Sequence, residues 1–504
     1  MVEKIAILDF GSQYTHLIAR RMRELRVHAI VHPYNIKANE ISDSKGIVLS
    51  GGPKSVYEED APFPDPVIFD LKVPILGICY GLQVIGKIFG GRVASSKVRE
   101  YGKMEFHVED DPLFSGISPT TIVWMSHGDR LTELPPDFKS IGRTRNSEFA
   151  AIRSENIYGL QFHPEVTHTS EGKKILENFL YSICEVGGNW KPHSFVDIAK
   201  EEIASKCIGG HTVLAYSGGV DSTVCSIIAK EVLGDNFTPI FVDTGFMREG
   251  EVEEINNGSK ELGLGIRVLN AKSRFLKTLE GVINPEKKRL IIGREFASVF
   301  EEEATGLNAK YLIQGTLYPD RIESVSDVGP SHTIKTHHNV GALPEDLRLE
   351  LAEPLKDFFK DEVREIAKFL KIPKKFYKRH PFPGPGLAVR ILGEVTEERL
   401  EVLKKVDHIY IKTLKELGLY DLIWQAFAVF IPVKTVGVMG DKRTYGNLIG
   451  LRAVDSKDGM TADWHHFKKE NLNLIVRRIL NEVKGVNRVV YDVSSKPPST
   501  IEWE

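Results

Sequence analysis

Short apolar runs alternate with amphipathic stretches along the first 190 residues. The runs, which predict buried parallel strands, cover residues 5–10, 46–50 and 74–78. Between and after them, apolar positions recur at helical spacing, as in residues 15–24 and 82–89. This order of strands and helices predicts a doubly wound α/β domain. A helix near residues 171–183 and a Gly- and Pro-containing linker place the end of this domain at residue 189.

The same alternation returns in a second segment, residues 190–384. Its expected strands are residues 212–216, 239–243, 266–269 and 310–314, and residues 222–232 form one of the helices between them. We therefore expect a second doubly wound parallel sheet. Residues 318–344 are rich in Gly, Pro, His and Lys, which predicts a long functional loop.

A smaller α+β domain is expected over residues 385–504, after a Pro- and Gly-rich boundary. Its long helix covers residues 396–417, and its strands cover residues 426–433, 448–454 and 488–493. Few helices remain to cover this sheet, so we expect its open face to pack on a partner. The predicted fold is therefore two doubly wound parallel-sheet α/β domains followed by a smaller α+β dimerisation domain.

Composition places the chain among ordinary globular proteins. It has 504 residues, of which 42% are hydrophobic and 27% charged, and its formal net charge is −3. That balance indicates neither nucleic acid nor an anionic membrane as a partner. The four cysteines form no Cys-x-x-Cys pair, and the sequence has neither the pattern of a signal peptide nor an apolar stretch that could span a bilayer. We expect a soluble cytoplasmic protein with reduced thiols.

The sequence Gly-Ile-Cys-Tyr-Gly at residues 77–81 follows a predicted strand and precedes a helix. Small neighbours allow the sharp turn of a nucleophile elbow, and N–H groups at the helix start, including that of Tyr80, favour a thiolate and can hold an oxyanion. A lone cysteine is more often simply buried. His163 and Glu165 favour catalysis, because residues two apart in a strand face the same side. They can therefore serve Cys79 as base and orienting carboxylate.

Ser-Gly-Gly-Pro at residues 50–53 ends an earlier strand at the same edge of the sheet. The N–H of Gly52 can supply a second oxyanion donor there, although an ordinary turn explains this stretch equally well. Residues 81–87 match most of a Walker phosphate loop, but Ile88 replaces the Ser or Thr that would hold magnesium. We interpret those residues as a packed helix.

A second candidate site follows the strand at residues 212–216 and opens a helix. It consists of Ser217, Gly218, Gly219, Val220, Asp221 and Ser222. The glycines allow close backbone approach, the hydroxyls add donors and the helix N-terminus favours anions, which predicts a cradle for the phosphates of ATP. The alternative is a turn with an N-cap. Because a carboxylate repels phosphate unless a cation intervenes, we expect Mg²⁺ held through the ATP phosphates, with Asp221 as a candidate ligand.

These motifs carry resemblances to known families. The Cys79, His163–Glu165 and Ser50–Pro53 motifs resemble those of the class I glutamine amidotransferases over the first 190 residues. The hexapeptide resembles the pyrophosphatase loop of enzymes that cleave ATP to AMP and pyrophosphate. Five further motifs, which begin at residues 318, 334, 380, 441 and 496, resemble in their order those of the glutamine-hydrolysing GMP synthases.

The resemblance implies a ligase whose substrates are glutamine, ATP and xanthosine monophosphate (XMP). It implies that Cys79, His163 and Glu165 release ammonia, that ATP adenylates XMP, and that ammonia displaces AMP to give GMP. It also implies Mg²⁺ as the cofactor and a homodimer. In this family pattern Lys335 lies on a lid over the nucleotides, and Asp320 and Glu323 form an acidic edge that couples the lid to the amidase.

The resemblance also implies a set of XMP contacts. They are Arg289, Gln425, Arg488, Lys496, Ile501, Glu502 and Glu504. His337 and His338 are adjacent and would diverge in a strand, so no zinc site is expected.

Two alternatives are open to different degrees. An NAD synthetase shares the ATP loop, but it would carry a nitrilase-type glutaminase and lack the third segment. A catalytically silent nucleotide sensor or scaffold belongs to a different class of protein, and the intact Cys79, His163, Glu165 and residues 217–222 weigh against it.

Overall fold

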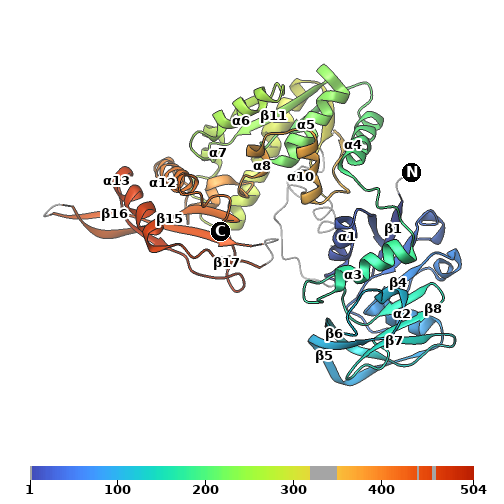
Figure 1. The fold of residues 1–504 in the computed structure, drawn as a ribbon. Coiled ribbons are helices and arrows are strands. Elements are labelled where there is room, and N and C mark those ends of the chain that lie inside the picture. Colours follow the sequence, from blue (N-terminus) through green and yellow to red (C-terminus); the bar gives the residue numbers. More distant parts are fainter. Residues whose placement is uncertain (1–2, 318–348, 440–441, 457–460) are drawn as a thin grey trace. The chain divides into compact units, whose positions relative to one another are not determined.

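The computed structural model describes residues 3–317, 349–439, 442–456 and 461–504 (Figure 1). The chain folds into two compact units, Met1–Ser194 and Phe195–Glu504. The first ends close to the predicted boundary at residue 189, and the second contains both remaining predicted segments. The three predicted domain boundaries stay predictions.

The first unit is built on a nine-stranded sheet with the order β2-β1-β3-β4-β9-β8-β7-β5-β6. Its parallel half comprises β2 (His28–Pro33), β1 (Lys4–Asp9), β3 (Gly46–Leu49), β4 (Ile75–Ile78) and β9 (Ile157–Leu160). Its antiparallel half comprises β8 (Ala151–Ser154), β7 (Lys139–Thr144), β5 (Arg92–Val108) and β6 (Thr120–Glu133). The three strands expected here are confirmed, whereas the antiparallel half was not predicted.

Helices complete the first unit. They are α1 (Thr15–Glu24), α2 (Tyr80–Ile88) and α3 (Gly172–Glu177), the short 3₁₀ turns Ala38–Glu40, Pro66–Leu71 and Pro112–Phe114, and a π-helical turn at Asn178–Ile183. The helix predicted near residues 171–183 therefore widens at its second half. There the Asn178 side chain donates hydrogen bonds to the carbonyls of Leu113 and Ser115, at 3.0 and 2.8 Å.

The second unit contains a five-stranded parallel sheet with the order β12-β11-β10-β13-β14. The strands are β10 (His211–Ala215), β11 (Phe237–Asp243), β12 (Arg267–Asn270), β13 (Ala309–Ile313) and β14 (Glu350–Ala352). The helices are α4 (Pro192–Lys206), α5 (Val220–Leu233), α6 (Glu251–Glu261), α7 (Lys272–Thr278), α8 (Pro285–Gly306), α10 (Lys360–Phe369) and α11 (Lys374–Tyr377), with a 3₁₀ turn at Gly234–Asn236. The four predicted strands and the helix after β10 are confirmed.

A second, four-stranded sheet in this unit carries the last part of the chain. Its strands are β15 (Gln425–Met439), β16 (Lys442–Asp455), β17 (Asp463–Trp464) and β18 (Val486–Tyr491), preceded by the 3₁₀ turn Gly386–Arg390. Helices α12 (Glu397–Glu416) and α13 (Lys469–Glu482) lie along this sheet (Figure 1). One hydrophobic core runs from Phe246 and Leu387 through Leu403 to Ile449, so both sheets of the unit share it.

None of the described helices is long and apolar enough to cross a membrane.

Close packing of α2 on the parallel sheet yields a test of this fold. A Cβ on Gly81 would lie 2.3 Å from the carbonyl oxygen of Leu49, at the end of β3. The backbone cannot yield without moving helix from sheet, so Gly81→Ala should cost the first unit about 1–3 kcal/mol of stability. Hydrogen exchange of peptides from β3 and α2 measures this loss.

Gly306→Ala is the matched control, because an added methyl there meets no atom within 4 Å. It should leave exchange in the first unit unchanged. Equal protection in wild type and Gly81→Ala would contradict the close packing of α2.

Candidate active sites

Cys79 occupies the sharp turn between β4 and α2. Its backbone has φ 54° and ψ −100°, a conformation that residues with a side chain rarely adopt. The Cys79 N–H donates to the Leu160 carbonyl at 2.7 Å, which ties the turn to the end of β9. A Cβ on Gly77 would lie 2.6 Å from the Gly81 backbone, so the glycines on both sides let strand and helix meet. The structure confirms the elbow predicted for this cysteine.

His163 and Glu165 lie in the loop that follows β9. The expectation that they belong to a strand is wrong, because β9 ends at Leu160. Their alignment comes instead from the turn, in which His163 Nδ1 lies 2.7 Å from Glu165 Oε1. Both side chains are buried, and the Glu165 carbonyl accepts a bond from Arg21 Nε at 3.0 Å. The loop is fixed further where the His163 carbonyl accepts from Thr169 Oγ1 at 2.6 Å.

The electrostatics of this pair favour a charged histidine. Burial alone would lower the pKa of His163, but the Glu165 carboxylate and a hydrogen bond with Cys79 outweigh it and hold that pKa well above its usual value of 6.5. Glu165 Oε2 is buried and has no hydrogen-bond partner among the described residues, so no donor there weakens the attraction between this carboxylate and His163. An imidazolium beside a thiol stabilises the thiolate.

The other three thiols have a different environment. Burial raises the pKa of Cys184, Cys207 and Cys225, and none of them has a histidine–carboxylate pair beside it among the described residues. All four cysteines are free of disulfides. Cys79 is therefore the thiol that the structure equips for nucleophilic attack.

The turn after β3 closes one side of the thiol site. A Cβ on Gly51 would lie 3.2 Å from His163 Cε1, and one on Gly52 would lie 2.8 Å from the Phe10 carbonyl oxygen. Gly52 also lies against the ring of Tyr80, the first residue of α2. Gly52 and Tyr80 therefore lie together beside Cys79. As the first residue of α2, Tyr80 has an N–H group without a partner inside the helix.

Two residues at the thiol site were not predicted. The Gln161 Nε2 lies 3.8 Å from Cys79 Sγ, and the Ser126 carbonyl oxygen lies 3.8 Å from the same sulfur. Gln161 is fully buried. A polar residue two positions before His163 in an apolar run was the signal for Gln161, whereas Ser126 contributes only its backbone and left none.

The predicted phosphate loop connects β10 to α5. Gly218 has φ 72°, and the helix begins at Val220 with Gly219 as its N-cap. Hydroxyls hold the loop together: Ser217 Oγ lies 3.1 Å from Ser222 Oγ and accepts from the Gly219 N–H at 3.3 Å. Asp221 and Ser222 are therefore inside the first helical turn and do not serve as the N-cap of the alternative interpretation.

Asp221 faces a cation that sequence reasoning missed. Lys360 Nζ, from the first residue of α10, lies 3.5 Å from Asp221 Oδ2. Within the described ranges, no group of three or more His, Cys, Asp and Glu side chains is placed to hold a metal ion. A site with one carboxylate beside a phosphate loop fits Mg²⁺, which binds proteins through one or two carboxylates together with substrate phosphates.

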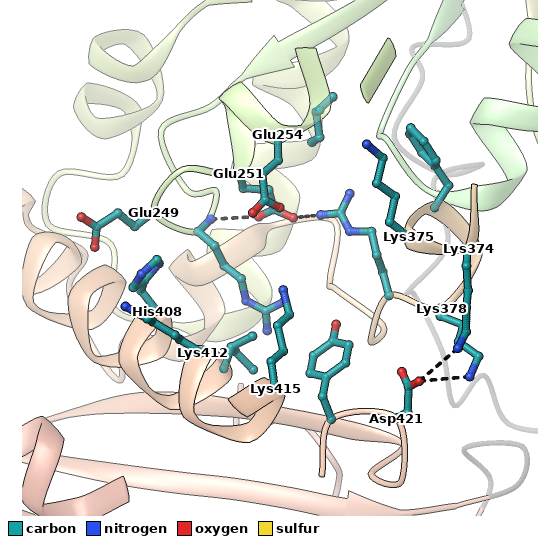
Figure 2. Close-up of a pocket in the computed structure, with 16 residues that line it drawn as sticks. Glu249, Glu251, Glu254, Lys374, Lys375, Lys378, His408, Lys412, Lys415 and Asp421 are labelled. Carbon is teal, nitrogen blue, oxygen red and sulfur yellow. Dashed lines mark hydrogen bonds and ion pairs between the residues drawn. The ribbon is translucent and has the colours of Figure 1, made fainter. Parts of the chain in front are cut away.

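Arg379 also contacts this loop. Its Nη1 donates to the Gly218 carbonyl at 3.2 Å, and a Cβ on Gly218 would lie 2.8 Å from Ile255. Both Arg379 and Ile255 also line a pocket of about 500 Å³ (Figure 2). The sequence motif that ends at Arg390 begins directly after Arg379, which was the available signal for this residue.

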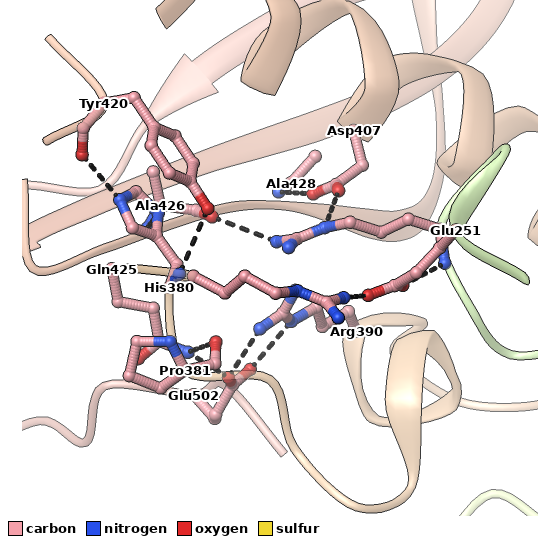
Figure 3. A network of polar contacts seen from close by, with 12 residues as sticks. Glu251, His380, Pro381, Arg390, Asp407, Tyr420, Gln425, Ala426, Ala428 and Glu502 are labelled. Carbon is pink, nitrogen blue, oxygen red and sulfur yellow. Dashed lines mark hydrogen bonds and ion pairs between the residues drawn. The ribbon is translucent and has the colours of Figure 1, made fainter. Parts of the chain in front are cut away.

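The C-terminal residues predicted to contact XMP are anchored and not frayed. Gln425 Nε2 donates to Glu502 Oε1 at 2.8 Å, and Arg390 binds both oxygens of Glu502, at 2.8 and 3.1 Å (Figure 3). Arg289 donates to the carbonyl of Glu504, whose carboxylate pairs with Lys288. The structure thus brings Arg289, Gln425, Glu502 and Glu504 to one part of the second unit.

Arg390 and Lys288 were not predicted at this place. Both are fully buried, and the Arg390 guanidinium carbon lies 4.1 Å from the centroid of the Phe427 ring. Burial lowers the pKa of Lys288, against the opposing effect of Glu504. Arg390 Nη1 and Arg289 Nε are buried and have no hydrogen-bond partner among the described residues.

Of the remaining predicted residues, three lie in the second unit and three lie outside the described ranges. Ile501 packs in a small apolar cluster with Phe427, while Lys496 forms a β-bridge with Ala462. Arg488 is exposed on β18. Asp320, Glu323 and Lys335 lie outside the residues that the structure describes.

Comparisons with known proteins agree with these motifs. Residues 6–183 match the family "Glutamine amidotransferase class-I", and residues 412–503 match "GMP synthase C terminal domain". The chain is 54% identical to "GMP synthase [glutamine-hydrolyzing]" of Thermosipho melanesiensis over the whole of both chains. It is 52% identical to the protein of the same name from Chlorobium chlorochromatii, also over the whole of both. The chain therefore belongs to the family of glutamine-hydrolysing GMP synthases.

Proposed function

We propose that the two sites perform successive parts of one ligase reaction. XMP, ATP, glutamine and water become GMP, AMP, pyrophosphate and glutamate. The observation that carries this proposal is the pairing, in one chain, of a buried Cys79–His163–Glu165 constellation with the loop at residues 217–222. Membership of the family, over the full length of the chain, supports the same reaction.

In the amidase part, the Cys79 thiolate attacks the side-chain amide carbon of glutamine. The N–H groups of Gly52 and Tyr80 hold the oxyanion that forms, and the His163 imidazolium gives a proton to the departing ammonia. Water, activated by His163, then hydrolyses the thioester to glutamate and restores the thiol. Glu165 keeps the ring oriented and stabilises its charged form throughout.

In the ATP part, the loop at residues 217–222 holds the phosphates that leave as pyrophosphate. The carbonyl oxygen at C2 of XMP attacks the α-phosphorus and forms an adenylated base, from which ammonia later displaces AMP. Mg²⁺ is the proposed cofactor: bound to the phosphates with Asp221 as a ligand, it would neutralise their charge. Lys360 lies within reach of Asp221 and supplies positive charge at the same place.

For XMP we propose contacts from the predicted set. Arg289, Gln425, Glu502 and Glu504 are the members with mutual contacts. Ile501, Lys496 and Arg488 complete the proposal. Arg390 joins it, because its buried Nη1 has no hydrogen-bond partner among the described residues.

Coupling between the two parts is a further proposal. We propose that Lys335 closes over ATP and XMP, and that Asp320 and Glu323 transmit this closure to the amidase. Glutamine hydrolysis would then be slow until both nucleotides are bound, which prevents the loss of ammonia.

We also propose a cytoplasmic homodimer. Apolar side chains lie exposed on β15 and β16, and the most exposed are Val438 at 74% and Tyr445 at 69%. Exposed apolar side chains on one ribbon are typical of a protein interface, and a second copy of the same ribbon is the partner we propose. The free cysteines fit a reducing compartment.

Replacement of the nucleophile separates the two parts of the reaction. Cys79→Ala should lower glutamine-dependent GMP synthesis by at least about 10,000-fold, because no other group can form the thioester. Synthesis from high ammonium should persist. Cys207→Ala removes a buried thiol elsewhere and should keep both activities. Near-normal use of glutamine by Cys79→Ala would refute the assignment of this nucleophile.

Glu165→Gln tests the charge on His163 through the pH dependence of stability. A raised folded pKa stabilises the protein fully below pH 6.5, and this stabilisation is lost as the pH rises through the folded value. The melting temperature of wild type should therefore exceed that of Glu165→Gln most near pH 6, and the gap should narrow toward pH 9.5. Glutaminase activity should fall less than in Cys79→Ala. A gap that widens with pH would mean that His163 is neutral in wild type.

Asp221→Asn tests the step shared by both nitrogen sources. It should lower synthesis from glutamine and from ammonium alike, by about 100-fold or more, because the phosphate charge loses its proposed cation ligand. Asp235→Asn removes an exposed carboxylate just after the same helix and serves as the control. Full activity of Asp221→Asn with ammonium would contradict the role of Asp221 in the ATP step and favour the interpretation of residues 217–222 as a structural turn.

A further inference from the structure

A pocket of about 500 Å³ opens in the second unit between α6, α11 and α12 (Figure 2). Seven of its sixteen lining residues are Lys or Arg, and four are Asp or Glu. No lining residue belongs to the loop at residues 217–222 or to the predicted XMP contacts. The pocket is thus a separate feature with an excess of positive charge.

The cations of the pocket do not each pair with a separate carboxylate. Asp421 is shared by Lys374 and Lys378, at 3.4 and 3.2 Å. Lys412 and Lys415, both from α12, form no ion pair within the described part of the chain. Lys415 instead lies 5.3 Å from the centroid of the Tyr420 ring. Lys375 pairs with Glu261, outside the pocket, so among the described residues Lys412 and Lys415 are the ammonium groups of the pocket without an ion pair.

Two guanidinium groups also line the pocket, and each has a carboxylate partner. Arg379 pairs with Glu251, and Arg248 pairs through its Nε with Asp407 at 2.6 Å. Desolvation, together with the charge of Arg248, lowers the pKa of Arg379, so the two guanidinium groups act on each other. Like charges held close together cost free energy that a bound anion relieves.

We propose that this pocket is a binding site for an oligophosphate, a chain of two or more phosphate groups, distinct from the site of ATP cleavage. Ammonium and guanidinium groups from three segments of the chain match the several charged oxygens of an oligophosphate better than those of a single carboxylate. The volume accommodates a triphosphate. The Tyr420 ring also lines the pocket and is stacked on His380, with ring centroids 3.8 Å apart.

The position of the pocket connects it to both candidate substrate sites. Arg379 reaches the Gly218 carbonyl of the phosphate loop at 3.2 Å. On the other side, Arg248 Nη2 donates to the Ala426 carbonyl at 3.3 Å, next to Gln425, and Figure 3 shows the resulting chain of contacts to Glu502. The proposed oligophosphate site thus adjoins the backbone of the phosphate loop and the backbone next to Gln425, one of the predicted XMP contacts.

Calorimetric titration of the full chain with sodium tripolyphosphate tests the site. Lys412→Met/Lys415→Met removes the two cations that form no ion pair with the described residues, and both side chains are exposed, so the fold should be kept. Wild type should bind one more tripolyphosphate per chain than this double variant, or bind it at least about 10-fold more tightly. Lys404→Met/Lys405→Met removes the same charge from the same helix outside the pocket and should bind like wild type.

The same titrations can overturn the proposal, and a second ligand identifies the occupant. Equal affinity and stoichiometry in wild type and Lys412→Met/Lys415→Met would overturn the proposal, as would an equal loss in the control variant. A parallel titration with uridine triphosphate distinguishes the occupants: tighter binding than tripolyphosphate, lost in the pocket variant, assigns a nucleoside oligophosphate, and weaker binding assigns an inorganic chain.

Discussion

Parallel strand pairing is the constraint on which both candidate sites depend. A parallel sheet buries its strands on both faces, so polar side chains of a site must come from the loops at the strand ends. Register then decides which loops meet. Leu49 pairs with Gly77, and Ile78 pairs with Leu160, so the turns after β3, β4 and β9 emerge side by side. The oxyanion region, Cys79 and the histidine loop come together for this reason.

Strain at Cys79 follows from the same geometry. A helix that must start directly at the strand end requires a backbone turn with positive φ, at a cost of order 1–3 kcal/mol for a residue that is not glycine. The bond from the Cys79 N–H to Leu160 and the close approach of α2 to β3 hold that turn. The packing of α2 on the sheet therefore offsets the backbone strain that places the Cys79 sulfur beside His163.

How far the sequence predicts this molecule depends on the range of the interactions involved. Apolar runs predict the parallel strands because burial on both faces leaves a continuous signal. The antiparallel strands β5–β8 were missed: β6 alternates buried and exposed positions over polar residues, so its signal is weaker. His163 and Glu165 were paired correctly but for the wrong reason, since a turn and not a strand aligns them. Lys288 and Arg390 were missed because their partners, Glu504 and Glu502, lie more than 100 positions away.

The carboxylates of the C-terminal tail limit how a nucleotide can bind beside them. Glu502 and Glu504 already neutralise the buried cations Arg390 and Lys288, and a carboxylate repels a phosphate at the same place. Their free acceptor capacity instead suits the N–H groups of a purine base or the hydroxyls of a ribose. Arg390 Nη1 and Arg289 Nε have no hydrogen-bond partner in the part of the chain that the structure describes, and such N–H donors would suit the opposite end of such a ligand, its phosphate or its carbonyls. A nucleotide that binds here must therefore turn its neutral hydrogen-bond donors toward the tail and its acceptors toward the two arginines.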